Sequence, residues 1–339
     1  MKVDKMLGIA LVAVATMSGC KCLAPDSCCK CAQEDAVLGR WALDLKPLGD
    51  SYKTMNAGWL GVTKKEGRLT GSMLWRWATP FTIHDVSLDD AGRLHFTAHG
   101  AKCVATVNGD AMSIERTVLN NDGTVNQGES GVFPGRRIPL VTTPEDLEYW
   151  EPRYGQPVDL FANGLDDWKT IGGKSDKDYG GWTFKDGVLV NRVEGRKDVG
   201  HLNLITKRND FKDFKLSFDV NLFPGCNSGV YLRGIYEIQM LDTIGKPNSS
   251  HNMCALYGRV APSQRAEKKA GEWQKVEIVL ARRLVTVTLN GVVVLDHAPC
   301  EGVTGGALTA DEFVPGPLYL QGDHSDVQYR NMVLTPIVN

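Results

Sequence analysis

The sequence has too little net charge to attract a charged partner over a long range, and it has no apolar run long enough to cross a membrane. The amino-terminal apolar run, Met6–Thr16, is shorter than the roughly 20 residues that a membrane-spanning helix needs. The 38 basic residues nearly balance the 40 acidic ones, so the formal net charge is only -2. Such a chain generates no field that would draw in a polyanion. We therefore do not expect nucleic acid to be a partner.

Helical periodicity is also scarce. Only the short segment Thr143–Trp150 has the period of a helix, whereas short alternating runs punctuated by Asn, Asp and Gly recur along the chain. Glycine is abundant, at 36 residues, as in proteins with many tight turns. None of the nine cysteines stands in a recognisable nucleophile setting. The composition predicts an all-β protein without a catalytic cysteine.

The first 20 residues have the features of an export signal. Lys2 and Lys5 precede the apolar run, and small residues follow it. The ending Met17-Ser18-Gly19-Cys20 resembles the processing box of bacterial lipoproteins, in which the cysteine becomes the lipid-modified first residue. The resemblance implies a protein of the bacterial cell envelope, periplasmic or outer-membrane facing, held to the membrane by a lipid on Cys20. A plain secretory signal is the alternative.

Cysteines crowd the segment after Cys20, residues 21–37, which we interpret as a tether. Disulfides within it suit an exported chain better than a zinc knot, because the adjacent Cys28 and Cys29 fit paired zinc ligands poorly. Four further cysteines lie far apart in the globular part, and the sequence leaves open whether they are buried thiols or bridges: Cys103, Cys226, Cys254 and Cys300.

Residues 38–140 form a series of short predicted strands with turns at Glu66-Gly67 and Asn108-Gly109. They predict a small separate β-barrel or sandwich domain. Its tryptophans Trp59, Trp75 and Trp77 either pack in a core or stack on a sugar, because an aromatic face offers apolar area to ring C–H groups.

A proline-rich, acidic linker, residues 141–156, separates this unit from a second one. Residues 157–339 contain many short antiparallel strand patterns, which predict a two-sheet sandwich of the jelly-roll type. The linker leads us to expect that this second domain folds on its own.

The stretch NSGVYLRGIYEIQMLD, residues 227–242, has an unusual second face. Val230, Leu232, Ile238 and Met240 alternate as a buried strand face should, while Tyr231, Arg233, Glu237 and Gln239 alternate against them. An ordinary solvated face would favour Lys, Thr and Ser. These polar residues therefore indicate a functional face, although a structural Arg–Glu pair across the sheet is the alternative.

Eight segments in order resemble the 3-keto-disaccharide hydrolase family over residues 157–337. They are LFANGLDDWK, WTFKDGVLV, DFKLSFDVNL, NSGVYLRGIYEIQMLD, ALYGRVAPS, GEWQKVEIVL, VTVTLNGVVVLD and LYLQGDHSDVQYRNMVL. The resemblance implies a concanavalin-like jelly-roll sandwich that acts on glycosides whose sugar is a ketone at carbon 3. Such a ketone acidifies the hydrogen at carbon 2, so elimination and addition of water give net hydrolysis.

This chemistry needs a base, donors at the ketone and an acid for the leaving oxygen. The catalytic candidates are Glu237, His324 and Asp242, with Glu237 or His324 as the base. The candidates for substrate binding are Arg233, Gln239, Tyr231, Tyr257, Gln321 and His201. Partial burial by aromatic residues would raise the pKa of Glu237 toward neutrality.

A cofactor is not required by any spacing in the sequence. A divalent cation held by Glu237, Asp242 and His324 is a possible electrophile in place of Arg233. Two other functions stay open: a non-catalytic carbohydrate-binding module and a conventional glucanase-like glycosidase. The glucanase is disfavoured because Gln239 stands where a second acid would be expected.

Overall fold

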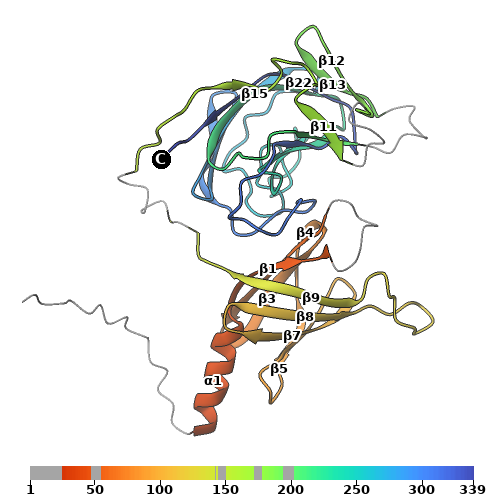
Figure 1. Cartoon of the computed structure of the whole chain (residues 1–339), viewed down its shortest axis with the longest axis vertical. Coiled ribbons are helices and arrows are strands. Elements are labelled where there is room, and N and C mark those ends of the chain that lie inside the picture. Colours follow the sequence, from red (N-terminus) through yellow and green to blue (C-terminus); the bar gives the residue numbers. More distant parts are fainter. Residues whose placement is uncertain (1–24, 47–54, 142, 144–149, 172–177, 194–201) are drawn as a thin grey trace, which may run out of the picture.

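The computed structural model describes residues 25–46, 55–141, 143, 150–171, 178–193 and 202–339, and the side chains from residue 31 onward. The described residues are all-β apart from one helix, which confirms the predicted fold class. Figure 1 shows the two β domains one above the other, with the carboxy-terminal domain at the top. The predicted signal (residues 1–20), its Cys20 and most of the helix predicted at Thr143–Trp150 lie outside the described residues.

The amino-terminal domain is one nine-stranded antiparallel sheet, in the order β4-β3-β2-β1-β9-β8-β7-β6-β5. Only Ile83 separates β4 from β5, which are the two ends of this order, so the sheet must curl back on itself into a barrel-like shape. The strands are β1 (Gly39–Asp44), β2 (Ala57–Lys65), β3 (Arg68–Trp75), β4 (Trp77–Thr82), β5 (His84–Leu88), β6 (Leu94–Ala98), β7 (Ala101–Asn108), β8 (Ala111–Thr117) and β9 (Gly131–Ile138).

The helix α1 (Pro25–Val37) occupies most of the segment that we predict to be a tether, and the sequence analysis did not predict this helix. Proline is favoured at the first position of a helix, and the run from Ala32 to Ala36 contains good helix formers. The carboxyl end of α1 packs on the sheet: Arg137 donates to the carbonyl of Ala36 at 2.8 Å, and Trp41 donates to that of Val37 at 3.1 Å. In the described part of the chain, no helix is long and apolar enough to cross a membrane.

The carboxy-terminal domain is the predicted sandwich of two antiparallel sheets. The larger sheet has the order β12-β13-β22-β15-β18-β19-β20, with β10 beside β22, and the smaller has the order β11-β14-β21-β16-β17. Its strands are β10 (Val158–Asp159), β11 (Trp168–Ile171), β12 (Trp182–Lys185), β13 (Val188–Asn191), β14 (Asn203–Thr206), β15 (Phe214–Leu222), β16 (Asn227–Leu232), β17 (Tyr236–Leu241), β18 (Trp273–Ala281), β19 (Leu284–Leu289), β20 (Val292–Pro299), β21 (Tyr319–Leu320) and β22 (Val327–Pro336).

The core of the sandwich lies between these sheets and continues to the other domain. Val230 and Ile238 of the smaller sheet belong to the same buried cluster as Phe218 of the larger one. That cluster also contains Trp59 and Leu74 of the amino-terminal sheet. The cysteines Cys103, Cys226, Cys254 and Cys300 are buried free thiols, which resolves the alternative left open by the sequence.

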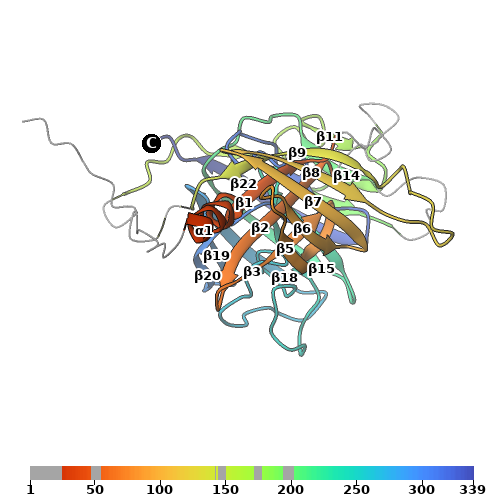
Figure 2. The same ribbon diagram turned by 90° about the horizontal axis from the view of Figure 1, so that it is seen from below.

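The two domains share an extensive polar interface as well. Arg40 pairs with Glu301 at 2.5 Å, and Arg136 pairs with Asp311 at 2.9 Å. The view from below shows strands of the amino-terminal sheet lying across the sandwich (Figure 2). The small domain is therefore docked on the jelly roll.

Candidate active site

A small polar pocket lies on the face of β16, β17 and β21 that points away from the sandwich core. Tyr231 pairs directly with Glu237 across β16 and β17, and with Tyr319 on the neighbouring β21. Gly229 pairs with Gln239 two residues further along the two strands. Because side chains alternate along a strand, these residues share one face while Val230 and Ile238 enter the core. The polar alternation in the sequence therefore reflects a real second face.

Glu237 lies at the bottom of this pocket with only 3% of its surface exposed. Burial raises the pKa of its carboxyl group to about 8, and the nearby Asp323 charge adds to the rise, while the hydrogen bond from Tyr231 opposes it. A Cβ at position 229 would lie 2.3 Å from Glu237 Oε1, so only glycine leaves room for the carboxyl group there. The strand pair is thus shaped to hold a buried acid.

The hydrogen bonds of Tyr231 also indicate a protonated Glu237. The Tyr231 hydroxyl lies 2.8 Å from Glu237 Oε2 and 2.8 Å from the carbonyl oxygen of Gly305. The hydroxyl has one proton, and a carbonyl only accepts. Both contacts are hydrogen bonds only when Glu237 carries a proton and donates it to Tyr231, which then donates to Gly305.

His324 and Asp323 stand together at the exposed side of the pocket. His324 Nδ1 lies 2.6 Å from Asp323 Oδ1, and the His324 side chain is 48% exposed. The hydrogen bond to Asp323 raises the pKa of His324 above its usual value, against the opposing effect of partial burial. With Nδ1–H directed to the carboxylate, Nε2 is the nitrogen that can accept a proton when the ring is neutral.

Two glutamines line the pocket with unused hydrogen-bonding capacity. Among the described residues, no hydrogen-bond partner reaches the buried Oε1 atoms of Gln239 and Gln321. Tyr257 also lines the pocket, and Tyr319 stacks on Tyr231 with ring centroids 4.1 Å apart. Buried amides without partners are costly, so a ligand with hydroxyl groups would satisfy them.

The amino-terminal domain supplies one wall of the pocket. Met55, Trp77 and Ala78 line it opposite the strands of the sandwich. The enclosed volume is about 110 Å³, well below that of pockets that bury a whole drug-sized ligand. A disaccharide can therefore place only part of itself inside and must extend beyond the mouth.

Arg233 does not lie in this pocket, contrary to our expectation that it shares a face with Glu237. The chain leaves the strand after Leu232, and Arg233 occupies the turn before β17 with a φ of 56°. Its guanidinium group donates to the backbone carbonyl of Glu312 at 2.7 Å and to that of Val314. Arg233 thus anchors the loop around residue 312.

Asp242 does not line the pocket either. It follows the last residue of β17 and accepts a hydrogen bond from the backbone of Gly225 at 3.0 Å. The metal ligand set of Glu237, Asp242 and His324 is therefore not assembled, and the described ranges hold no group of three or more acidic, His or Cys side chains suited to a metal ion. His201 lies outside the described residues.

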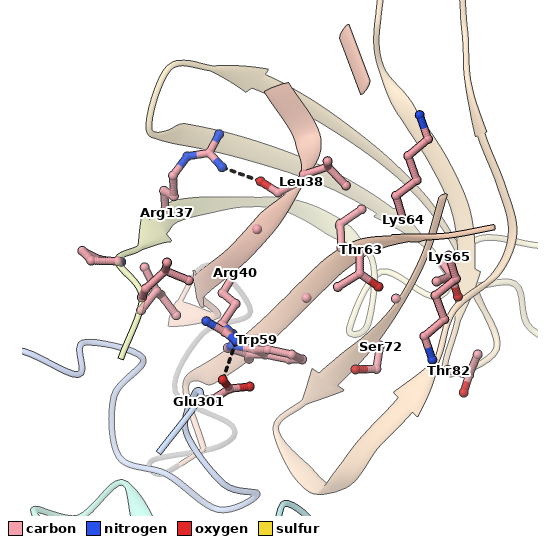
Figure 3. Close-up of a pocket in the computed structure, with 18 residues that line it drawn as sticks. Leu38, Arg40, Trp59, Thr63, Lys64, Lys65, Ser72, Thr82, Arg137 and Glu301 are labelled. Atoms are coloured by element: carbon pink, nitrogen blue, oxygen red, sulfur yellow. Dashed lines mark hydrogen bonds and ion pairs between the residues drawn. The ribbon is translucent and has the colours of Figure 1, made fainter. Parts of the chain in front are cut away.

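A second, larger cavity of about 1050 Å³ opens beside the amino-terminal sheet (Figure 3). Trp59, Thr63, Ser72 and Lys65 line it, and Glu301 reaches it from the sandwich domain. Glu301 is its only acidic lining residue among those described, and it is paired with Arg40. A cavity without an available acid–base pair is a poor place for glycoside cleavage, so the Glu237 pocket is the candidate active site.

Comparison with known families assigns the sandwich domain to a family. Residues 156–335 match the family described as the 3-keto-alpha-glucoside-1,2-lyase-like domain. The chain belongs to this family. The match covers all three strands of the pocket and confirms the resemblance read from the sequence. The sandwich is therefore a carbohydrate-active, glycosidase-like domain. No curated protein matches the chain significantly.

Several solved structures resemble the lyase-like domain. A candidate glycosyl hydrolase from Parabacteroides distasonis is 26% identical with a TM-score of 0.43, over 57% of this chain and 95% of that one. Another from the same organism is 20% identical with a TM-score of 0.44, over 54% and 94%. The carbohydrate-binding module CBM66 from Bacillus subtilis is 10% identical with a TM-score of 0.31, over 49% and 93%.

The sequence did not single out every residue of the pocket. Asp323 precedes His324 directly, and this dipeptide was the available signal for the pair. Tyr319 follows from its alternation with Leu318 and Leu320. The wall formed by Met55, Trp77 and Ala78 lies outside the lyase-like domain, and no local pattern links it to Glu237.

Proposed function

We propose that the protein cleaves 3-keto-glycosides, including 3-keto-disaccharides, by removing the proton at carbon 2, expelling the group at carbon 1 and adding water. The observation that carries this proposal is the meeting of a buried carboxyl group and a His–Asp pair in one polar pocket. The family description names a 1,2-lyase, which is an elimination across carbons 1 and 2. The substrate in this proposal is thus a sugar already oxidised at carbon 3.

His324 is the proposed base. Its Nε2 takes the proton from carbon 2, and the electrons of that C–H bond move toward the ketone to give an enolate. Asp323 holds the ring through Nδ1 and stabilises the imidazolium ion that forms. The pair lies at the exposed side of the pocket, where the ring can exchange its proton with water afterwards.

Glu237 is the proposed acid, whereas the sequence left Glu237 and His324 as alternative bases. Burial keeps Glu237 protonated at neutral pH, because it raises the pKa of the carboxyl group to about 8. When the enolate collapses, the bond from carbon 1 to the leaving oxygen breaks and that oxygen takes the proton of Glu237. The pocket thus provides an acid, Glu237, and a base, His324, because their environments shift the pKa values of the two groups.

Water completes the reaction by adding to the double bond between carbons 1 and 2. The carboxylate of Glu237 left by the first step accepts a proton from this water, whose hydroxyl joins carbon 1, and His324 returns a proton to carbon 2. Gln239, Gln321 and Tyr257 line the pocket and are the proposed partners of the sugar hydroxyls or the ketone oxygen. The enzyme then has its starting protonation state again.

A panel of substrates tests the proposal. Purified protein is incubated with 3-keto-trehalose, methyl 3-keto-glucoside and their unoxidised parents, with and without a chelator. We expect cleavage of the keto compounds only. Cleavage of the unoxidised sugars alone would show a conventional glycosidase, and sugar binding without turnover of any compound would show a binding module.

We further propose that the protein is anchored in the bacterial envelope by a lipid on Cys20, because that cysteine ends a short apolar segment within a lipoprotein-like box. Cys20→Ser should then leave unprocessed precursor in the membrane fraction. Normal cleavage to a soluble product would contradict the anchor.

A further inference from the structure

We propose that Trp77 of the amino-terminal domain is the platform on which the leaving group of the substrate stacks, so that selectivity for this group resides outside the lyase-like domain. The inference rests on the function proposed above and extends it to a binding site for the part of the substrate beyond the scissile bond. The ligand class is a sugar or an aromatic aglycone.

Exposure distinguishes Trp77 from the neighbouring tryptophans. Trp59 is 7% exposed and Trp75 is 4% exposed, as expected of core residues, whereas Trp77 is 46% exposed. Trp77 also lines the Glu237 pocket. An aromatic side chain with this much exposure is not part of a core. Its flat ring is well suited to stack on the apolar face of a sugar ring. Of the three tryptophans considered from the sequence, Trp77 is thus the one whose side chain is largely exposed at the pocket.

The backbone holds Trp77 firmly at the pocket. Arg76 and Ala78 on either side have φ values of 66° and 65°, a conformation that costs free energy outside glycine. The Arg76 carbonyl accepts a hydrogen bond from Gly306 at 2.8 Å. A Cβ at Gly305 would lie 2.2 Å from the Ala78 carbonyl oxygen, so the two backbones are in close contact.

The same contact connects Trp77 with the acid. Gly305 accepts a hydrogen bond from Tyr231, whose hydroxyl also contacts Glu237. The segment carrying Trp77 therefore packs against the carbonyl that fixes the bond network of the acid. Because Glu237 protonates the leaving oxygen, the group attached to that oxygen must lie close to it.

The size of the pocket places the platform on the leaving-group side. The enclosed volume of about 110 Å³ leaves part of any disaccharide outside. The reacting ring must reach Glu237 and the two glutamines at the bottom, so the other ring extends to the exposed side. Trp77 is the most exposed aromatic residue that lines the pocket among the described residues.

The test compares kcat/KM of the full chain and three variants, Trp77→Ala, Trp77→Phe and Phe81→Ala. Phe81 is a matched control because it is an exposed aromatic residue of the same strand that does not line the pocket. The substrates are 3-keto-trehalose and 4-nitrophenyl 3-keto-glucoside, with large leaving groups, and methyl 3-keto-glucoside, with a small one.

We expect Trp77→Ala to lower kcat/KM about 3- to 10-fold for the two large leaving groups, the range that one aromatic contact provides. The methyl compound should change less than about twofold, Trp77→Phe should recover most of the loss, and Phe81→Ala should behave as the wild type. An equal loss for large and small leaving groups, or no loss at all, would overturn the proposal.

Binding measurements separate this inference from the proposed function. If the wild type turns over no 3-keto-glycoside, titration calorimetry with trehalose and with 4-nitrophenyl glucoside takes the place of kinetics. Binding that Trp77→Ala weakens and Phe81→Ala does not would support the platform even though the reaction is different. Binding that Trp77→Ala leaves unchanged, or the absence of binding by the wild type, would contradict it.

Discussion

The buried carboxyl group of Glu237 distinguishes this sheet face from one that merely binds sugars. Glu237→Gln keeps the size of the side chain and can donate a hydrogen bond to Tyr231, as the protonated carboxyl group does, but it has no acidic proton to give to a leaving oxygen. We expect kcat to fall about 10²-fold or more on a 3-keto-glycoside. Steady-state kinetics measures this loss, and near-normal turnover would remove Glu237 from the acid role.

The same residue predicts a pH dependence of stability. A glutamate in an unfolded chain ionises at a pH of about 4.3, whereas the folded protein holds the proton of Glu237 up to a pH of about 8. Between these values the folded state binds more protons, so this residue makes the free energy of unfolding fall as pH rises. Glu237→Gln should therefore gain stability relative to the wild type across that range.

Thermal unfolding of both proteins from about pH 4 to pH 9 measures the difference. It should grow in favour of the variant up to about pH 8 and then become constant. A difference that does not change with pH would show that Glu237 ionises in the folded protein as it does in the unfolded chain.

The ionisation of His324 determines the acidic side of the pH profile of activity. A base must be neutral, and the hydrogen bond to Asp323 raises the pKa of His324. We expect kcat/KM to rise through a pKa above the usual value of about 6.5 and to fall again near pH 8 as Glu237 ionises. His324→Gln should lose activity about 10²-fold, and its remaining activity should lack the rising side. Retention of that side would assign the base to another group.

Strand alternation predicted much of the site, and the exceptions have physical reasons. Tyr231, Glu237 and Gln239 share a face because they stay within regular strands. Arg233 has the same spacing, but it lies in a turn where alternation no longer applies. Burial of Glu237 depends on Gly229 and on a loop distant in sequence, which a local pattern does not specify.

At the scale of elements, the start of β4, with Trp77 and Ala78, is the part of the amino-terminal sheet that lines the pocket. Gly305→Ala would place a methyl group against the Ala78 backbone, which cannot move as a flexible side chain can. We expect a loss of about 1–3 kcal/mol in stability, typical of overpacking, together with a lower kcat/KM for substrates with large leaving groups.

Gly128→Ala is the matched control for this change. Gly128 has no positive φ, and its nearest non-neighbouring atom is 3.5 Å from the added carbon. Its stability and kinetics should stay close to those of the wild type, as measured by thermal unfolding and by the same assay. Equal behaviour of the two variants would mean that the contact at Gly305 is dispensable.

The strands were predictable from the sequence because they are short alternating runs with turn residues between them, such as Asn108-Gly109 between β7 and β8. The helix α1 was missed because four of the nine cysteines lie in and beside it, and we interpreted them as a disulfide framework instead of reading the helix formers around them. In this segment the high cysteine content outweighed the helix propensity of the other residues in our interpretation.

At the scale of the whole molecule, the two domains are in close contact. Trp59 packs so closely on the sandwich that a Cβ at Gly302 would lie 2.3 Å from its Nε1 atom, and Arg259 lies 4.3 Å over its ring. These contacts join residues distant in sequence, so the linker composition alone could not predict them. The expectation that the second domain folds on its own stays a prediction, and these contacts suggest that the amino-terminal domain adds to its stability.

A fragment of residues 157–339 tests this dependence. We expect it to unfold at a lower temperature than the full chain, because it exposes apolar surface that Trp59 and Leu74 cover. It should also lose most of its activity on 3-keto-trehalose, since the wall with Trp77 is gone. A fragment with the stability and kcat/KM of the full chain would show that the interface contributes to neither.

The most direct test of the central claim, removal of the proton at carbon 2, is turnover of a 3-keto-glycoside in D₂O with analysis of the product by NMR. We predict deuterium at carbon 2 of the released 3-keto sugar, because His324 exchanges its proton with solvent before returning one. Product incubated without enzyme controls for spontaneous exchange next to the ketone. Efficient cleavage with the original hydrogen kept at carbon 2 would contradict the account, because it would show direct displacement at carbon 1.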